Sequence, residues 1–193
     1  EAWMGGAKHI KDVVMVTLGT GVGGGIITDG KIVPGKHGLG GEIGHMHVRE
    51  SETEKCNCGG KGCLEQISSA TGIVREARKL LAKKKDTSRL ALIEDLTAKD
   101  VLDAAKAGDK LAIEVVDIVA KYLGIALAHI AMTVDPEIFV IGGGVSKAGD
   151  FLIDKIREKF IYYTPITKNK ADIVIAKLGN DAGIYGAAKL VIS

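Results

Sequence analysis

Aromatic residues and cysteines are scarce in this 193-residue chain, and its net charge is small. Aromatic side chains make up only 4% of it, which argues against a base-stacking surface for single-stranded nucleic acid. The formal net charge is only +2, so no strong field attracts nucleic acid or acidic lipid. The sequence shows no signal peptide and no apolar run that would span a membrane. We therefore expect neither a nucleic-acid partner nor a membrane partner.

The three cysteines all fall in one short segment. Cys56, Cys58 and Cys63 form the pattern C-N-C-G-G-K-G-C, and His45 and His47 lie just upstream. A disulfide is disfavoured, because the first two cysteines are too close to pair comfortably and three is an odd number. Three thiolates and one imidazole complete a tetrahedral Zn²⁺ site that has no position for water. The sequence predicts structural zinc, and metal-bound rather than paired cysteines favour the cytoplasm. Spacing alone does not choose between the two histidines.

A glycine-rich corner follows the first predicted strand. Val13–Leu18 is a continuous apolar run that predicts a buried strand, and residues 19–25 are mostly glycine. Short strands are then predicted at residues 26–28 and 31–33. The backbone N–H groups of the corner and the Thr20 hydroxyl could cradle phosphate. The corner is neither a Walker A loop nor a Rossmann loop, and a tight hairpin that needs glycine only for its shape explains it equally well.

The remainder of the chain alternates helices and strands. Amphipathic helices are predicted over residues 69–85, from Thr97, and over about 109–134. The last of these is apolar on most of its circumference, so we expect it at the centre of the core. Strand, helix, strand and helix are then predicted at residues 138–141, 147–160, 173–176 and 184–191. Strands, helices and then a βαβα unit predict an α/β fold with a mixed sheet.

Two further features have the composition of binding sites. Gly142, Gly143 and Gly144 follow a predicted strand and precede a helix, which is a weak signal for a nucleotide-binding corner. Glu42 lies in a glycine-rich loop, three residues before His45, where its carboxylate could grip hydroxyl groups. A solvated loop residue is the more common role for a lone glutamate.

The beginning of the chain resembles the end of a longer element. The first residue is Glu1 rather than methionine, Trp3 and Met4 are apolar, and Gly5-Gly6 resembles a helix stop. We expect this chain to be a piece of a longer protein.

Taken together, these motifs resemble the ROK family, named for repressors, open reading frames and sugar kinases. The likeness covers the whole chain, and two patterns carry it most specifically: Glu-x-Gly-His and Cys-x-Cys-Gly-x-x-Gly-Cys-x-Glu. The resemblance implies the actin-like (ribonuclease H-like) ATPase fold, with a mixed β-sheet, packed helices and a zinc-stapled loop. Residues 1–193 would form the larger, C-terminal lobe, and the N-terminal lobe would lie outside this chain.

The resemblance also implies roles for individual residues. His45, rather than His47, would bind zinc and turn its free ring nitrogen toward a sugar hydroxyl. The zinc ligands would be His45, Cys56, Cys58 and Cys63. The sugar-binding residues would be Glu42, His45 and Glu65. The nucleotide-binding residues would be Gly19, Thr20 and Gly21 at the phosphates and Gly142, Gly143 and Gly144 at the adenosine.

The implied reaction is phosphoryl transfer from ATP with Mg²⁺ to a hexose, with glucose preferred over fructose or N-acetylmannosamine and polyphosphate as an alternative donor. The catalytic base would be the aspartate of an Asn-Asp pair upstream of Glu1. Asn180-Asp181 lies in a C-terminal turn, where a capping role suffices, so we expect the isolated chain to be inactive. The resemblance also favours a homodimer. The alternatives are the sugar-sensing domain of a repressor and a zinc-stapled interaction module.

Overall fold

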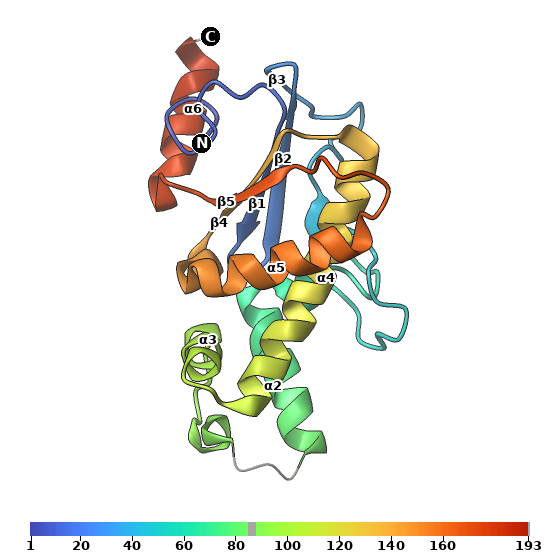
Figure 1. Cartoon of the computed structure of the whole chain (residues 1–193), viewed down its shortest axis with the longest axis vertical. Coiled ribbons are helices and arrows are strands. Elements are labelled where there is room, and N and C mark those ends of the chain that lie inside the picture. The colour runs from blue at the N-terminus through green and yellow to red at the C-terminus, as the bar shows by residue number, and fades with distance from the viewer. Residues whose placement is uncertain (85–87, 193) are drawn as a thin grey trace.

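The computed structural model describes residues 1–84 and 88–192 and contains a five-stranded mixed sheet with helices packed against it (Figure 1). The strands are β1 (Val13–Leu18), β2 (Val22–Thr28), β3 (Lys31–Ile32), β4 (Ile138–Gly142) and β5 (Asp172–Ile175). Their spatial order is β3-β2-β1-β4-β5. Strand β1 is antiparallel to β2 and parallel to β4, and β4 is parallel to β5. The predicted α/β class with a mixed sheet is confirmed.

The helices follow the predicted order. The α-helices are α1 (Glu65–Ser68), α2 (Ala70–Lys83), α3 (Ala98–Lys106), α4 (Lys110–Val134), α5 (Asp150–Tyr163) and α6 (Ala182–Ile192). The 3-10 helices are η1 (Ile43–His45), η2 (Arg89–Leu92), η3 (Gly144–Ala148) and η4 (Gly179–Asp181). The helix predicted to continue to Lys85 ends at Lys83, because Lys84 is extended; Lys85 itself lies outside the described residues.

Side-chain caps fix where three of the helices begin. Ser69 accepts a hydrogen bond from the Gly72 N–H at the start of α2. Thr97 and Asp100 form a reciprocal capping box at the start of α3, and Asp109 caps α4. Each cap satisfies N–H groups that have no partner within the helix, so these starts are encoded locally and the predictions are confirmed.

The core lies mainly between the sheet and α4. Val14, Val16 and Leu18 of β1 are buried on the helical side, whereas Val13 is buried with Val140 of β4 on the opposite face. Helix α4 packs against α2, α3 and α5, and Figure 1 shows it running from the sheet down to α2 and α3. Burial on both faces explains why β1 is apolar at every position except the exposed Thr17.

Two predicted boundaries are wrong. The glycines at residues 23–25 lie in β2 and pair with β1, so only residues 19–21 form the corner. A Cβ on Gly24 would lie 2.6 Å from the side chain of Ile43, so glycine lets the following loop pack onto this strand. The helix predicted from Lys147 begins at Asp150, because Gly149 adopts a φ of 72° and separates η3 from α5.

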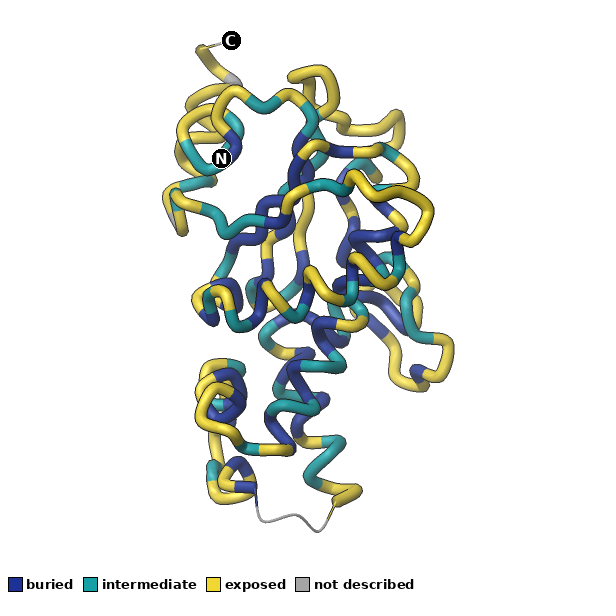
Figure 2. Tube along the Cα trace, viewed as in Figure 1, coloured by how far each residue is buried: buried dark blue, intermediate teal, exposed yellow. Residues whose placement is uncertain are grey.

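The start of the chain lies beside α6 (Figure 1). Trp3 and Met4 lie in a turn that the Gly5 N–H closes onto the Glu1 carbonyl oxygen at 2.9 Å, so the helix end predicted there stays a prediction. The Glu1 carboxylate accepts hydrogen bonds from the backbone N–H groups of Lys177 and Leu178, at 3.1 and 2.7 Å. Helix α6 is largely exposed (Figure 2). Across the described residues, we find no helix with the length and hydropathy needed to cross a membrane.

Candidate metal centre and active site

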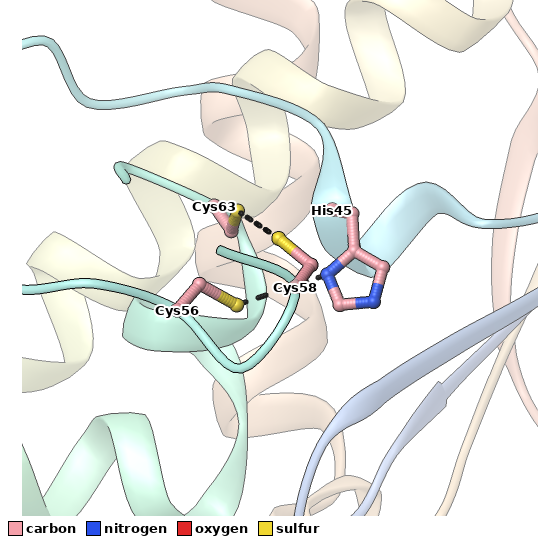
Figure 3. A group of neighbouring side chains, drawn as sticks. All are labelled: His45, Cys56, Cys58 and Cys63. Atoms are coloured by element: carbon pink, nitrogen blue, oxygen red, sulfur yellow. Dashed lines mark hydrogen bonds between the residues drawn. The ribbon is translucent and has the colours of Figure 1, made fainter. Parts of the chain in front are cut away.

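Four side chains from η1 and the following loop converge on one point (Figure 3). They are His45, Cys56, Cys58 and Cys63, and their ligand atoms all lie within 4.8 Å of one another. The Sγ atoms of Cys58 and Cys63 are 3.6 Å apart, and Cys56 Sγ lies 3.8 Å from His45 Nδ1. Zn–S bonds of about 2.3 Å place the sulfurs of a tetrahedral site roughly 3.8 Å apart. The donor set and its spacing therefore fit Zn²⁺.

Glycine turns bring the sulfur atoms together. Gly59 and Gly62 adopt φ angles of 88° and 70°, which are unfavourable for residues that carry a Cβ atom. The carbonyl of Gly62 accepts hydrogen bonds from the N–H groups of Val48 and Arg49, at 2.8 and 3.2 Å. The loop is therefore folded back on the segment that carries His45.

The structure distinguishes the two histidines. His47 points away from the sulfurs: its Nδ1 lies 2.7 Å from the Lys61 carbonyl oxygen and its Nε2 lies 3.0 Å from the Glu50 carboxylate. The Lys61 carbonyl, and then Glu50, raise the pKa of His47. Because η1 ends at His45, the segment is not an unbroken strand, in which two residues this far apart would point to the same side. His45 presents Nδ1 to Cys56, and its Nε2 lies 3.9 Å from the Glu42 carboxylate.

Two of the thiols differ in acidity. Burial, together with hydrogen bonds from Cys58 and Cys56, raises the pKa of the Cys63 thiol to about 12. The backbone N–H of Gly60, and then the Cys63 thiol, lower the pKa of the exposed Cys58. A cation must therefore displace the Cys63 proton, so metal affinity at this cluster falls as the pH falls.

Glu65 connects the cluster to the glycine corner. It is the first residue of α1, two positions after the last cysteine. Its Oε1 lies 3.8 Å from Cys56 Sγ, and its Oε2 accepts a hydrogen bond of 3.1 Å from the Val22 backbone N–H. The predicted sugar-binding residues therefore meet at the cluster, with Glu42 next to the His45 ring and Glu65 next to Cys56.

The corner at residues 19–21 opens onto a cavity of about 490 Å³, which Gly19 and Thr20 line. The carbonyl of Gly19 accepts the Ala70 N–H, and the carbonyl of Thr20 accepts the Thr71 hydroxyl, both at 2.8 Å. These two bonds tie the corner to the start of α2. Among the described residues, no hydrogen bond uses the backbone N–H of Thr20 or Gly21. Such free N–H groups can donate to an anion.

The second glycine run contributes only in part to this cavity. Gly144 lines it, whereas Gly142 and Gly143 do not. A Cβ on Gly142 would lie 2.6 Å from Met15 Cε, and a Cβ on Gly143 would overlap the backbone of Leu18. Close packing therefore explains these two glycines, and their nucleotide role stays a prediction.

Another part of the cavity is lined by lysines that no sequence pattern had singled out. Lys99 and Lys106 of α3 and Lys147 of η3 line it, next to the apolar side chain of Leu102. Lys99 forms an ion pair of 2.5 Å with Asp103. Single lysines on a helix surface resemble solvated residues in a sequence, and only the packing of α3 against η3 brings them together.

A buried ion-pair network clamps the cysteine loop to α2. Glu52 and Glu76 are only 6% and 5% exposed. Glu52 pairs with Arg75 and, at 3.2 Å, with Lys79, while Glu76 accepts a 2.7 Å hydrogen bond from Arg49. Buried charges persist only when they are paired, so these contacts fix the loop that carries the sulfurs.

The acidity of Glu52 gives a testable pH dependence. Burial raises its pKa, but the Glu54 N–H, Lys79 and the charge of Arg75 outweigh burial and lower the pKa from 4.5 to about 2. A depressed carboxyl pKa stabilises the fold above the unfolded value, and this stability is lost as the pH falls toward the folded value. We expect the difference in unfolding free energy between the unmodified protein and Glu52→Gln to shrink by roughly 2 kcal/mol from about pH 7 to about pH 3. Urea unfolding at both pH values measures it, and a difference that does not change with pH would contradict the ion pairing.

The mixed sheet, its glycine corner and the thiol–imidazole cluster define an α/β protein of the actin-like ATPase class. The sequence model of the ROK family matches residues 1–193, and the chain belongs to that family.

Three known proteins illustrate the range of its relatives. Over 99% of its length the chain is 49% identical to a glucokinase from Halalkalibacterium halodurans, of which it covers 59%. A ROK family glucokinase from Streptomyces griseus, solved in complex with glucose and AMPPNP, superposes with a TM-score of 0.84 at 34% identity; the match covers 96% of this chain and 62% of that one. The N-acetylglucosamine repressor of Escherichia coli is 37% identical over 81% of this chain, which covers 38% of the repressor. The chain thus spans about three fifths of the length of the two kinases.

Proposed function

We propose that this chain is the larger, C-terminal lobe of a kinase that transfers the γ-phosphoryl group of ATP to a hexose, with glucose as the preferred substrate. One observation carries the proposal: the Glu65 carboxylate contacts both the Cys56 thiol and the Val22 N–H that follows the glycine corner. A sugar held at the cluster would therefore lie next to a phosphate held at the corner. The kinases among the relatives, one of them solved with glucose and an ATP analogue, support this assignment.

In this proposal the chain binds and orients both reactants. The carboxylates of Glu42 and Glu65 accept hydrogen bonds from sugar hydroxyls, and the His45 ring accepts one or donates one. The backbone N–H groups of Thr20 and Gly21 donate hydrogen bonds to phosphate oxygens. Zn²⁺, when bound by the cluster, supplies a fixed orientation for the His45 ring. Phosphoryl transfer depends mainly on such positioning and on charge stabilisation, with ATP carrying Mg²⁺.

The base that removes the proton of the sugar hydroxyl belongs, in this proposal, to a segment outside the chain. Asp181 ends η4 and directly precedes α6, and the capping role predicted for it stays a prediction. The expected base is the aspartate of an Asn-Asp pair in the N-terminal lobe. Without a general base, a kinase loses roughly 10²–10⁴-fold in rate.

Comparing the isolated chain with the full-length protein tests the proposal. With ATP, Mg²⁺ and glucose, we expect the full-length protein to turn over at roughly 1–100 s⁻¹. We expect residues 1–193 alone to be at least about a hundred times slower, because the base is absent. Release of ADP measures both rates. Turnover by the isolated chain within about tenfold of the full-length protein would show that the base lies within these residues.

The sugar-sensing domain of a repressor is the second candidate, because the chain is also similar to an N-acetylglucosamine repressor. A sensor needs the residues that bind the sugar, but it does not need a glycine corner that binds phosphate. The free N–H groups beside the cavity favour the kinase. Calorimetric titration of the full-length protein separates the two, since a kinase binds AMPPNP with Mg²⁺ and a sensor binds only the sugar.

The proposal includes a cytoplasmic homodimer that has no membrane or nucleic-acid partner. Exposed apolar side chains near the end of α5, namely Ile161, Tyr162 and Ile166, offer a surface for self-association. The near-neutral charge and the scarcity of aromatic residues support the absence of a nucleic-acid partner.

A further inference from the structure

Gly21 faces the Glu65 carboxylate. A Cβ on Gly21 would overlap Glu65 Oε2 and lie 3.2 Å from Glu65 Cδ. Gly21 is not among the glycines with positive φ, so its backbone conformation does not require glycine. The absence of a side chain instead leaves the space that the carboxylate needs to reach the Val22 N–H.

We propose that Gly21 is a positioning residue for the sugar site, and this inference rests on the proposed function. The space at Gly21 lets Glu65 Oε2 accept a hydrogen bond from the Val22 N–H while Oε1 stays next to Cys56. The bond from the Val22 N–H holds Oε2 and thereby fixes the direction in which the other oxygen, Oε1, faces a sugar hydroxyl. Gly21 therefore acts on sugar binding through Glu65, in addition to any contact of its own N–H with phosphate.

The same geometry connects the two halves of the site. The N–H groups of Thr20 and Gly21 are free to bind phosphate, and the next N–H along the chain, that of Val22, holds Glu65. The proposed phosphate-binding and sugar-binding groups therefore share one short backbone segment.

Gly21→Ala separates this role from folding. The atoms that the new methyl group would meet belong to the far end of the flexible Glu65 side chain, which can move aside while the backbone stays in place. At Gly44, by contrast, a Cβ would overlap the Val22 carbonyl, and the backbone itself would have to shift. Gly25→Ala is the matched control, because Gly25 lies on the adjoining strand β2 and a Cβ added there would meet no atom within 4 Å.

The experiment measures the KM values for glucose and for ATP, with kcat, in the full-length protein. We expect Gly21→Ala to raise the glucose KM at least about tenfold, because Glu65 loses a charge-assisted hydrogen bond. The ATP KM should stay within about threefold, because alanine keeps the N–H. Zinc content and melting temperature should be unchanged, and Gly25→Ala should match the unmodified protein in every measurement.

A double-mutant cycle tests whether the effect passes through Glu65. If Gly21 acts only by placing that carboxylate, Glu65→Gln combined with Gly21→Ala should raise the glucose KM no further than Glu65→Gln alone. Additive effects, an unchanged glucose KM in Gly21→Ala, or equal rises in both KM values would overturn the inference, as would loss of zinc or of folding in this variant. If the unmodified full-length protein does not phosphorylate glucose, the proposed function itself fails.

Discussion

Replacing Cys58 by serine will release the metal from the protein and lower its melting temperature by at least about 10 °C. Structural Zn²⁺ contributes on the order of 10 kcal/mol of binding free energy to the folded state of small zinc domains. For a chain of this size, each kcal/mol shifts the melting temperature by roughly 2–4 °C, so a partial loss already gives a large shift. Elemental analysis measures the bound metal, and thermal unfolding with and without chelator measures the stability.

The two histidines provide matched variants for this prediction. His45→Ala removes a ring whose Nδ1 lies 3.8 Å from Cys56 Sγ, so it should lose metal as Cys58→Ser does. His47→Ala removes a ring whose hydrogen-bond partners among the described residues are Lys61 and Glu50, so it should keep the metal. An unmodified protein whose melting temperature is the same with and without chelator would show that no structural cation is bound.

The second large effect is expected at Glu52. Glu52→Ala should destabilise the fold by roughly 3–5 kcal/mol, because Arg75 and Lys79 would lose a buried negative partner. Urea unfolding in zinc-saturated buffer measures this cost separately from metal loss. Because Glu52 also accepts the N–H groups of Thr53 and Glu54, the variant should loosen the loop between the histidine and the first cysteine.

Glu50 is the control for this substitution, since it lies two residues away in the same loop. Its side chain is 98% exposed, and within the described part of the chain its ion-pair partner is His47. Glu50→Ala should therefore change the unfolding free energy by no more than about 0.5 kcal/mol. Equal costs at Glu50 and Glu52 would mean that the buried network does not hold the loop.

Much of the local structure follows from short stretches of sequence. Ser69, Thr97 and Asp109 begin helices as predicted, because a cap needs only a side-chain oxygen within three residues of the N–H groups it accepts. The strand at Val13–Leu18 was equally clear from its apolar run. The glycines at residues 23–25 were misleading, because they resemble a turn in sequence, whereas they form a strand onto which, at Gly24, the following loop packs closely.

The sequence by itself determined most of the helices and strands, their order and the three thiols of the candidate metal site, because hydrophobic periodicity, caps and ligand chemistry act within a few neighbouring residues. Only the tertiary structure decided which histidine meets the sulfurs, which lysines line the cavity, and that Glu65 reaches the Val22 N–H across 43 positions of sequence. These contacts depend on how the sheet, η1 and α1 pack together. Packing is a property of the whole chain, so the bond between Glu65 and Val22 leaves no signal in the residues around either one.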